Sequence, residues 1–371
     1  MRTKALVTTV CVIFVPTLLI YYVYYDSLYD RTVTQPRHSS AALVGSGSSS
    51  SSSNNVVPIL TDSVQSHHKY AGIWENQLNQ GGANGAAYNA SRRAAVRALF
   101  KAPPLPTPAA SRDPTPGIET KRAFVREMMK DAWSNYARYA WGYNELKPES
   151  REPKTDSIFG SAKIGATIVD SLDTLLLMDL KAEFATAKDW LATSFHFAAT
   201  ENEVSVFETV IRYVGGLLTV YAMTGDELFL NKSLEVAEAL LPAYATETGL
   251  PHGLIVPATK RNYHHSWAFG SILSEMGSQQ LEYSYLSDMT GDGRFRDAVL
   301  RIRNRLDSTP KQAGLYMTMM DSSTGRWNEN KSTMGALGDS FYEYLLKSHA
   351  QHPGNQPDAA QLSYLAAVDE E

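Results

Sequence analysis

The chain has 371 residues, enough for more than one domain of average size, and a formal net charge of −5. This slightly acidic balance excludes the strongly basic surface typical of nucleic-acid-binding proteins, so we expect no nucleic-acid partner. Hydrophobic residues make up 43% of the sequence, a normal share for a folded protein, but they are unevenly distributed along it.

The first predicted element is an apolar run, Ala5–Tyr25, which follows Arg2 and Lys4 and precedes Asp26. A helix of this length can cross the roughly 30 Å hydrocarbon core of a lipid bilayer. A cleaved signal peptide has a shorter apolar core and a small-residue cleavage site. We therefore expect an uncleaved anchor whose basic N-terminal flank stays in the cytosol, with the rest of the chain in the lumen. The single cysteine, Cys11, lies within the anchor, so no luminal disulfide is expected.

A stem is predicted between the anchor and the folded part. It includes the serine-rich stretch Ser46–Asn55, a flexible linker composition, and the proline-rich stretch Ala102–Gly117. Because neither has the apolar periodicity of a core, we expect this stem to be disordered. Asn-x-Ser tripeptides, which agree with luminal exposure, make three candidate glycosylation sites: Asn89, Asn231 and Asn330. The predicted parts are a cytosolic tail, an anchor, a luminal stem and a helical domain, at residues 1–4, 5–25, 26–117 and 118–371.

Amphipathic helices dominate the sequence from residue 118 onward, because apolar residues recur there at steps of three and four. Predicted helices cover residues 122–141, 163–180, 183–197, 204–223, 228–245, 271–289, 294–306 and 339–349. No alternating series of strands separates them. Short strands or loops are expected only around 250–267 and 314–318. The predicted fold class is all-α.

A weak internal repeat supports an array of helical hairpins. Thr-Gly-Asp occurs at 224–226 and at 290–292, each time followed by a phenylalanine and a helix. The glycine is suited to ending one helix, and the aspartate is suited to capping the next. The corresponding aromatic residues are Phe184, Phe229 and Phe295. Repeats at such steps indicate an α/α array or toroid.

The segment 204–223, "VSVFETVIRYVGGLLTVYAM", carries only two charged residues, Glu208 and Arg212. On a helix they share one face, which Gly215 and Thr219 continue. A surface ion pair is the simplest alternative, but a solvent-exposed face normally carries more charge. In a mostly buried helix, isolated charges are costly unless they are paired or used. We therefore predict a functional site here, approached closely by another part of the protein.

Other carboxylates have simpler explanations from pattern alone. Asp339 and Asp170 each stand before an apolar helix, where an aspartate is usually a cap, and residues 340–343 match a capping box. Glu275 and Glu282 are seven residues apart, which places them on one helix face, lining a pocket or facing water.

Several kinds of chemistry lack their motifs in this sequence, including metal-ligand clusters, glycine-rich phosphate loops and HExxH. The pair His264–His265 has no partner motif. Carboxylates are left as the candidate catalytic groups, since an acid near apolar surface has a raised pKa and can donate a proton at neutral pH. Glycoside hydrolysis is one reaction that two carboxylates perform, and pattern alone leaves it open.

Four segments in order closely resemble glycoside hydrolase family 47, the class I α-1,2-mannosidases: residues 135–148, 165–180, 204–226 and 335–347. The resemblance extends over Lys121–Ala350. It implies an (α/α)7 toroid, of which this chain holds a part, that removes α-1,2-linked mannose from high-mannose Asn-linked glycans with inversion and with bound Ca²⁺. The anchor and stem are similar to those of Golgi members, which implies a single-pass type II protein of the Golgi membrane with its catalytic part in the lumen.

The resemblance also implies roles for individual residues. Glu208 matches the proton-donating acid of the family, and Arg212 matches an arginine that contacts the sugar. Asp339 matches a second catalytic carboxylate, and Glu275 matches a substrate-contacting acid. Leu337 falls where Golgi-type members have leucine and endoplasmic-reticulum-type members have arginine.

Two family motifs have no counterpart after Asp339: the Arg-Pro-Glu motif with the catalytic base, and the motif whose threonine binds Ca²⁺. Lys147–Glu149 imitates the first but belongs to the opening segment of the resemblance. We therefore expect an N-terminal part of the catalytic domain, inactive alone, and assign no residue to Ca²⁺. The alternatives are a mannose-glycan-binding relative without turnover, in glycoprotein quality control, and a non-functional fragment. The stem and Leu337 favour the Golgi enzyme.

Overall fold

The computed structural model describes residues 116–154, 158–311 and 315–351. The predicted membrane anchor, nearly all of the stem and the candidate glycosylation site Asn89 lie outside the described residues. The domain and membrane assignments for those parts stay predictions.

Helices form the framework of the described residues, as the apolar periodicity predicts. In chain order they are α4 (Ile118–Tyr139), α5 (Ala166–Leu177), α6 (Lys181–Ser194), η1 (Phe197–Ala199), α7 (Val206–Thr209), η2 (Val210–Val214), α8 (Gly215–Thr224), α9 (Glu227–Leu240), η3 (Leu241–Tyr244), α10 (Leu273–Met276), α11 (Gln280–Thr290), α12 (Arg294–Ser308) and α13 (Asp339–Ala350).

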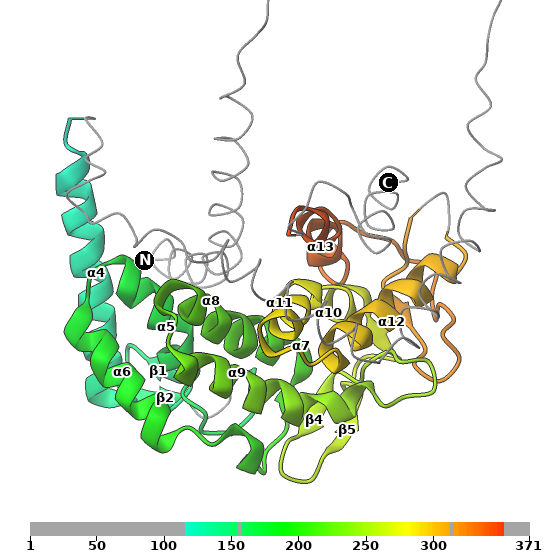
Figure 1. Cartoon of the computed structure of the whole chain (residues 1–371), viewed down its shortest axis with the longest axis horizontal. Helices are drawn as coiled ribbons and strands as arrows, with labels where there is room; N and C mark the ends of the chain where they lie inside the picture. Colours follow the sequence, from blue (N-terminus) through cyan, green and yellow to red (C-terminus); the bar gives the residue numbers. More distant parts are fainter. Residues whose placement is uncertain (1–115, 155–157, 312–314, 352–371) are drawn as a thin grey trace, which may run out of the picture.

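Consecutive helices pack as hairpins. Helix α5 contacts α6, α8 contacts α9, and α11 contacts α12. One helix of each hairpin also contacts the next hairpin, giving a row in which α8 meets α5 and α11, and α13 meets α11. Figure 1 shows these helices following an arc, with α4 at one end and α12 and α13 at the other. The predicted array of hairpins is confirmed here, while its membership in a partial (α/α)7 toroid stays a prediction.

Short antiparallel strands join the helices, so the all-α prediction is incomplete. They form three small sheets: β1 (Glu145–Lys147) with β2 (Glu152–Lys154); β3 (Val204–Ser205), β4 (Leu254–Val256) and β5 (Arg261–Tyr263); and β6 (Ser271–Ile272) with β7 (Met319–Met320). The hairpin of β4 and β5 falls within the range 250–267 where strands are expected, whereas the other strands lie outside the expected ranges. In the central sheet Ser205 pairs with Leu254, and Leu254 with Tyr263.

Two predicted helices are interrupted in the structure. Residues 204–223 comprise β3, α7, η2 and α8, and residues 271–289 comprise β6, α10 and α11. The second break occurs at Gly277, where an added Cβ would lie 2.3 Å from the ring of Phe341. The glycine at the end of α10 therefore leaves room for a long-range contact with Phe341, for which local periodicity contains no signal.

The turns of the internal repeat form as predicted. Gly225 and Gly291 follow α8 and α11 with left-handed φ values of 69° and 78°. Asp226 and Asp292 each accept a hydrogen bond, 3.0 Å long, from the backbone N–H two residues later. The repeated glycine therefore ends a helix and the repeated aspartate satisfies a free donor of the next one.

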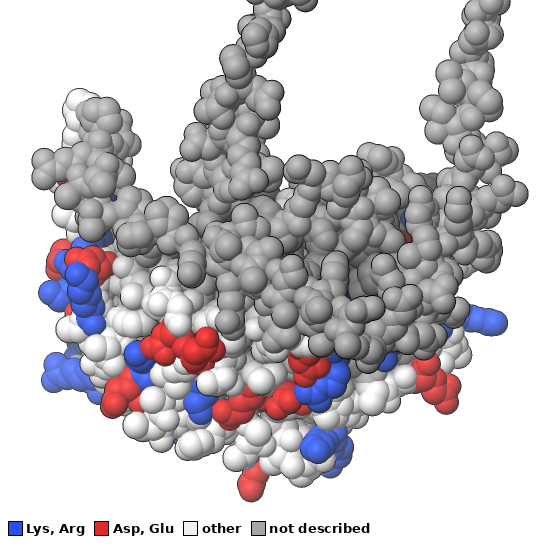
Figure 2. Space-filling view, viewed as in Figure 1, with Lys and Arg blue, Asp and Glu red and all other residues white. Residues whose placement is uncertain are grey.

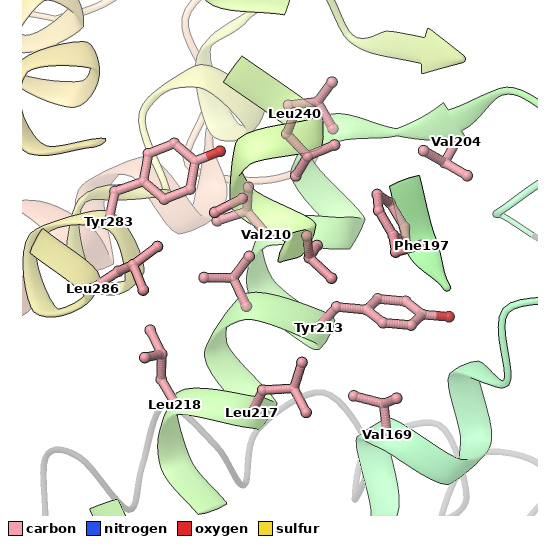
Figure 3. Packing of buried hydrophobic residues seen from close by; sticks show 14 of the residues in the cluster. Val169, Phe197, Val204, Val210, Tyr213, Leu217, Leu218, Leu240, Tyr283 and Leu286 are labelled. Atoms are coloured by element: carbon pink, nitrogen blue, oxygen red, sulfur yellow. The ribbon is translucent and has the colours of Figure 1, made fainter. Parts of the chain in front are cut away.

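Aromatic side chains form a cluster around Tyr213, which lies in the apolar segment 204–223. The ring of Tyr213, in η2, lies 5.2 Å from that of Phe159 and 5.9 Å from those of Phe195 and Phe197. Figure 3 shows Tyr213 beside Phe197 in this packing. The Tyr213 hydroxyl donates to the backbone oxygen of Ile164 at 3.2 Å, so its polar end is satisfied although the residue is fully buried.

Among the described residues, Val206–Thr224 is the one stretch whose length and apolar composition would suit a membrane span. Two thirds of it is buried against the rest of the protein, as in the core helix of a folded domain. This agrees with the expectation that Glu208 and Arg212 lie in a mostly buried segment. By contrast, acidic and basic side chains are interspersed on the visible surface around α4, α6 and α9 (Figure 2).

Candidate active site

Glu208 lies in the single turn of α7, just after the central sheet. Ser205, the last residue of β3, caps this turn: its hydroxyl accepts a hydrogen bond from the Glu208 N–H at 3.3 Å. The Val206 N–H donates to the Gly253 carbonyl at 2.9 Å, which ties the start of α7 to the loop before β4. The position of Glu208 is therefore set by a strand, a cap and a neighbouring loop.

Arg212 occupies η2, a wider π-helical turn between α7 and α8. Its Nε donates to Glu208 Oε2 at 2.8 Å, so the two charges share one face as the spacing predicts. Single π turns within helices occur frequently at functional sites, because they redirect side chains without ending the helix.

Asp170 is the third member of this cluster, and its predicted role as a helix cap is wrong. It lies inside α5, past the first turn, and its Oδ2 accepts from Arg212 Nη1 at 3.3 Å. The helix begins earlier, after Gly165, whose left-handed backbone and missing side chain make room for Trp190. The exposed side-chain fractions are 10% for Asp170, 15% for Arg212 and 23% for Glu208, so the cluster is largely shielded from water.

Burial decides the protonation behaviour of this cluster. It raises the pKa of Asp170 to about 7, although the charge and hydrogen bond of Arg212 act in the opposite direction. Burial also raises the pKa of Asp173, on the same helix, to about 6. For Arg212, burial would lower the pKa, but the carboxylates of Asp170 and Glu208 outweigh it and raise the value.

The predicted close approach to the charged face is confirmed, and the approaching residue is Glu282. A Cβ on Gly215 would lie 3.3 Å from the Cγ of Glu282. Glu282 accepts a hydrogen bond from the Tyr344 hydroxyl at 2.7 Å, and burial raises its pKa to about 7. The prediction that Glu275 shares a helix face with Glu282 is wrong, since the two belong to α10 and α11.

Glu275 lies instead beside a histidine of the loop after β5. The Nε2 of His265 is 3.2 Å from Oε1 of Glu275, and this carboxylate raises the pKa of His265. Both side chains cover Gly253, where an added Cβ would be 3.2 Å from Oε2 of Glu275. Because the Gly253 carbonyl accepts from Val206, Glu275 is near the start of α7. The indole of Trp267 stacks on His265 at 5.2 Å and is exposed.

Leu337 and Asp339 lie next to α10. The Ser274 N–H donates to the Leu337 carbonyl at 2.9 Å, and Leu337 has a left-handed φ of 78°. Helix α13 begins at Asp339 as predicted, but the capping box is wrong. The Ser340 hydroxyl donates to the Ser274 carbonyl and accepts from Ser278, while the Ser340 N–H donates to Asp339 Oδ1 at 2.9 Å.

The predicted site residues thus form two groups. One contains Glu208 and Arg212, together with Asp170, which sequence reasoning missed. The other contains Glu275, Leu337 and Asp339, gathered around α10. Within the residues described, no hydrogen bond or ion pair joins Asp339 to Glu208. The available signal for Asp170 was the one used for Glu208: a charged residue inside an apolar helix.

Two of the candidate glycosylation sites are described, and both asparagines are exposed. Asn231 is on α9, and Asn330 is in the loop after β7. The part of the chain that the structure describes contains no group of three or more His, Cys, Asp or Glu side chains placed to hold a metal ion. We assign none of the described residues to the Ca²⁺ ion that the family resemblance implies.

The chain is similar in sequence and in structure to known glycoside hydrolases. Residues 128–370 match the sequence model of glycosyl hydrolase family 47. Mannosyl-oligosaccharide alpha-1,2-mannosidase IA of Spodoptera frugiperda is 50% identical over 254 residues, covering 68% of this chain and 38% of that protein. Mannosyl-oligosaccharide 1,2-alpha-mannosidase IB of Mus musculus is 43% identical over 274 residues, covering 72% and 42%. The solved α-1,2-mannosidase from Trichoderma reesei superposes with a TM-score of 0.60 at 25% identity, covering 68% of this chain and 53% of its own.

Proposed function

This chain belongs to glycosyl hydrolase family 47, and we propose that it supplies part of the catalytic domain of an enzyme that hydrolyses terminal α-1,2-linked mannose from high-mannose Asn-linked glycans. The relatives that match it are mannosyl-oligosaccharide α-1,2-mannosidases, which are glycoside hydrolases. The matched part of the chain spans 38% and 42% of the lengths of these two relatives, which is less than half of either protein. The main support for this proposal is the position of Glu208. Its carboxylate is largely shielded from water and is hydrogen-bonded to Arg212 within a mostly buried segment.

In this proposal Glu208 is the general acid, which gives its proton to the glycosidic oxygen as the bond to the mannose breaks. Arg212 orients the Glu208 carboxyl through the 2.8 Å hydrogen bond and contacts the sugar. Inversion also needs a water that attacks the anomeric carbon from the opposite face and loses a proton to a base, with the acid and base carboxyl groups about 6.5–9.5 Å apart. We assign no described residue to that base.

The second group of residues supplies recognition. Asp339 provides a second carboxylate at the start of α13, where its charge can stabilise the positive charge that develops on the sugar. Glu275 contacts hydroxyl groups of the substrate, and Leu337 shapes the space next to it. No residue described here is assigned to Ca²⁺, and no step is assigned to the ion.

The proposal is tested by completing the chain with the remaining part of a relative's catalytic domain, incubating it with a high-mannose glycan, and measuring both free mannose and bound glycan. Mannose release from the completed chain supports the enzyme. Glycan binding without mannose release would favour the glycan-binding alternative, and the absence of both would contradict each of these functions.

Replacing Leu337 with arginine is expected to change the order in which the α-1,2-mannose branches are removed. Arginine introduces a long charged donor beside Glu275, where leucine offers only apolar contact. Separating the partially trimmed glycans by chromatography at successive times measures the order. Leu337→Met, which keeps an apolar side chain of similar volume, is the control and should retain the original order. An unchanged order in Leu337→Arg would contradict the role of this residue.

We further propose that residues 5–25 anchor the protein in the Golgi membrane with the catalytic part in the lumen. When the chain is synthesised with sealed microsomes, the part beyond the anchor should resist added protease. Enzymatic removal of glycans should increase its gel mobility. A variant with Gln at Asn89, Asn231 and Asn330 is the control and should show no mobility change. Protease sensitivity of the C-terminal part in intact microsomes would refute this topology.

A further inference from the structure

The Arg212 guanidinium is held from two sides by carboxylates of different helices. Its Nε faces Glu208 of α7, and its Nη1 faces Asp170 of α5, 42 residues earlier in the chain. An arginine side chain has about 2 kcal/mol of rotamer entropy, so one hydrogen bond leaves much of its motion unrestricted. A second contact from the opposite side removes that freedom.

The surroundings of Asp170 show why this contact is specific. Helix α5 is strongly apolar, and a carboxylate within it is costly unless it is paired. Asp173 lies one turn later on the same helix and is also buried, but its Oδ1 accepts from the Thr174 N–H at 2.6 Å. Among the described carboxylates of α5, Asp170 is therefore the one that contacts Arg212.

We propose that Asp170 is a positioning residue, which holds Arg212 in the orientation that presents its Nε to Glu208. This inference rests on the proposed function for its catalytic meaning, but the positioning itself is a property of the folded chain. Asp170 acts through Arg212 and does not contact the substrate.

The contact is expected to depend on pH. The titratable and charged groups that face Asp170 are Arg212, Glu208, Asp173 and the Tyr213 hydroxyl. Burial raises the pKa of Asp170 to about 7, so its charge is present above that pH and is lost as the pH falls through it. Below this pH the Asp170–Arg212 ion pair is lost, and Arg212 is left with Glu208 as its partner.

The test follows the Arg212 Nε by NMR in the full chain labelled with ¹⁵N-arginine, with its signal assigned by comparison with Arg212→Lys. In the native chain this signal should shift with a midpoint near pH 7. In Asp170→Asn the shift with that midpoint should vanish. Asp173→Asn is the matched control, since it removes a buried carboxylate of the same helix. It should keep the transition but move it to lower pH, because the Asp173 charge raises the pKa of Asp170.

Asp170→Glu keeps the experiment decisive if Asp170→Asn does not fold. A folded Asp170→Glu variant should retain a titration of the Arg212 signal, since it keeps a carboxylate within reach. The proposal is overturned if Asp170→Asn keeps the native titration of the Arg212 signal, or if folded Asp170→Glu lacks it. Loss of the transition in Asp173→Asn would also overturn it.

Mannose release gives a separate readout. Asp170→Asn should lower kcat by up to about 100-fold with little change in KM, because misplaced catalytic groups affect the chemical step more than binding. A fall in substrate affinity with unchanged kcat would contradict positioning. If the chain completed with the remaining part of a relative's catalytic domain releases no mannose, the proposed function fails, and the NMR experiment on the chain itself still decides whether Asp170 positions Arg212.

Discussion

In the chain completed with the remaining part of a relative's catalytic domain, replacing Glu208 with glutamine is expected to lower mannose release by about 10²- to 10⁴-fold while glycan binding is retained. The amide keeps the shape of the side chain and still accepts the hydrogen bond from Arg212 Nε. It has no acidic proton, however, so the leaving glycosidic oxygen must depart without protonation. Free mannose measured over time gives the rate, and calorimetric titration with the glycan gives the affinity.

A matched control is available on α9. Glu235 is also partly buried and is paired, with Lys232 at 3.0 Å, and it accepts from the Phe197 N–H at 2.8 Å. Glu235→Gln removes a comparable charge away from the candidate site and should leave mannose release unchanged. If Glu208→Gln retains activity within a few-fold of the native protein, Glu208 is not the general acid.

Replacing Tyr213 with alanine is expected to lower the free energy of unfolding by about 3–5 kcal/mol, as for other buried aromatic side chains. The ring fills the space between Phe159, Phe195 and Phe197, and its removal leaves a cavity in the core. Because Tyr213 follows Arg212 within η2, loss of this packing also loosens the turn that presents the guanidinium. Denaturant unfolding of the full chain in detergent, followed by tryptophan fluorescence, measures the change.

Tyr213→Phe separates the packing from the hydrogen bond. This variant keeps the ring and loses only the donor to the Ile164 carbonyl, so it should cost about 1 kcal/mol. Equal losses in Tyr213→Ala and Tyr213→Phe would show that the hydroxyl, rather than the ring, anchors η2.

Part of the candidate site is predictable because its signal is local. Glu208 and Arg212 are separated by one helical turn in a segment with no other charge, so their shared face follows from helix geometry alone. Asp170 is also a charged residue in an apolar stretch, but an aspartate in this sequence pattern can equally be the cap of a helix that begins after it. Only the position of the helix start, four residues before it, distinguishes the two interpretations.

The sequence by itself determined the helical class, the repeated turns at Gly225 and Gly291, and the family, because each depends on short-range periodicity or on contiguous motifs. The tertiary structure decided where the long helices break and which charges meet. Gly277, where α10 ends, leaves room for the close approach of Phe341, and Arg212 bridges to Asp170 across 42 residues of sequence. Such contacts form only when separate helices pack, so their geometry depends on all the elements between them and leaves no periodic trace in either segment.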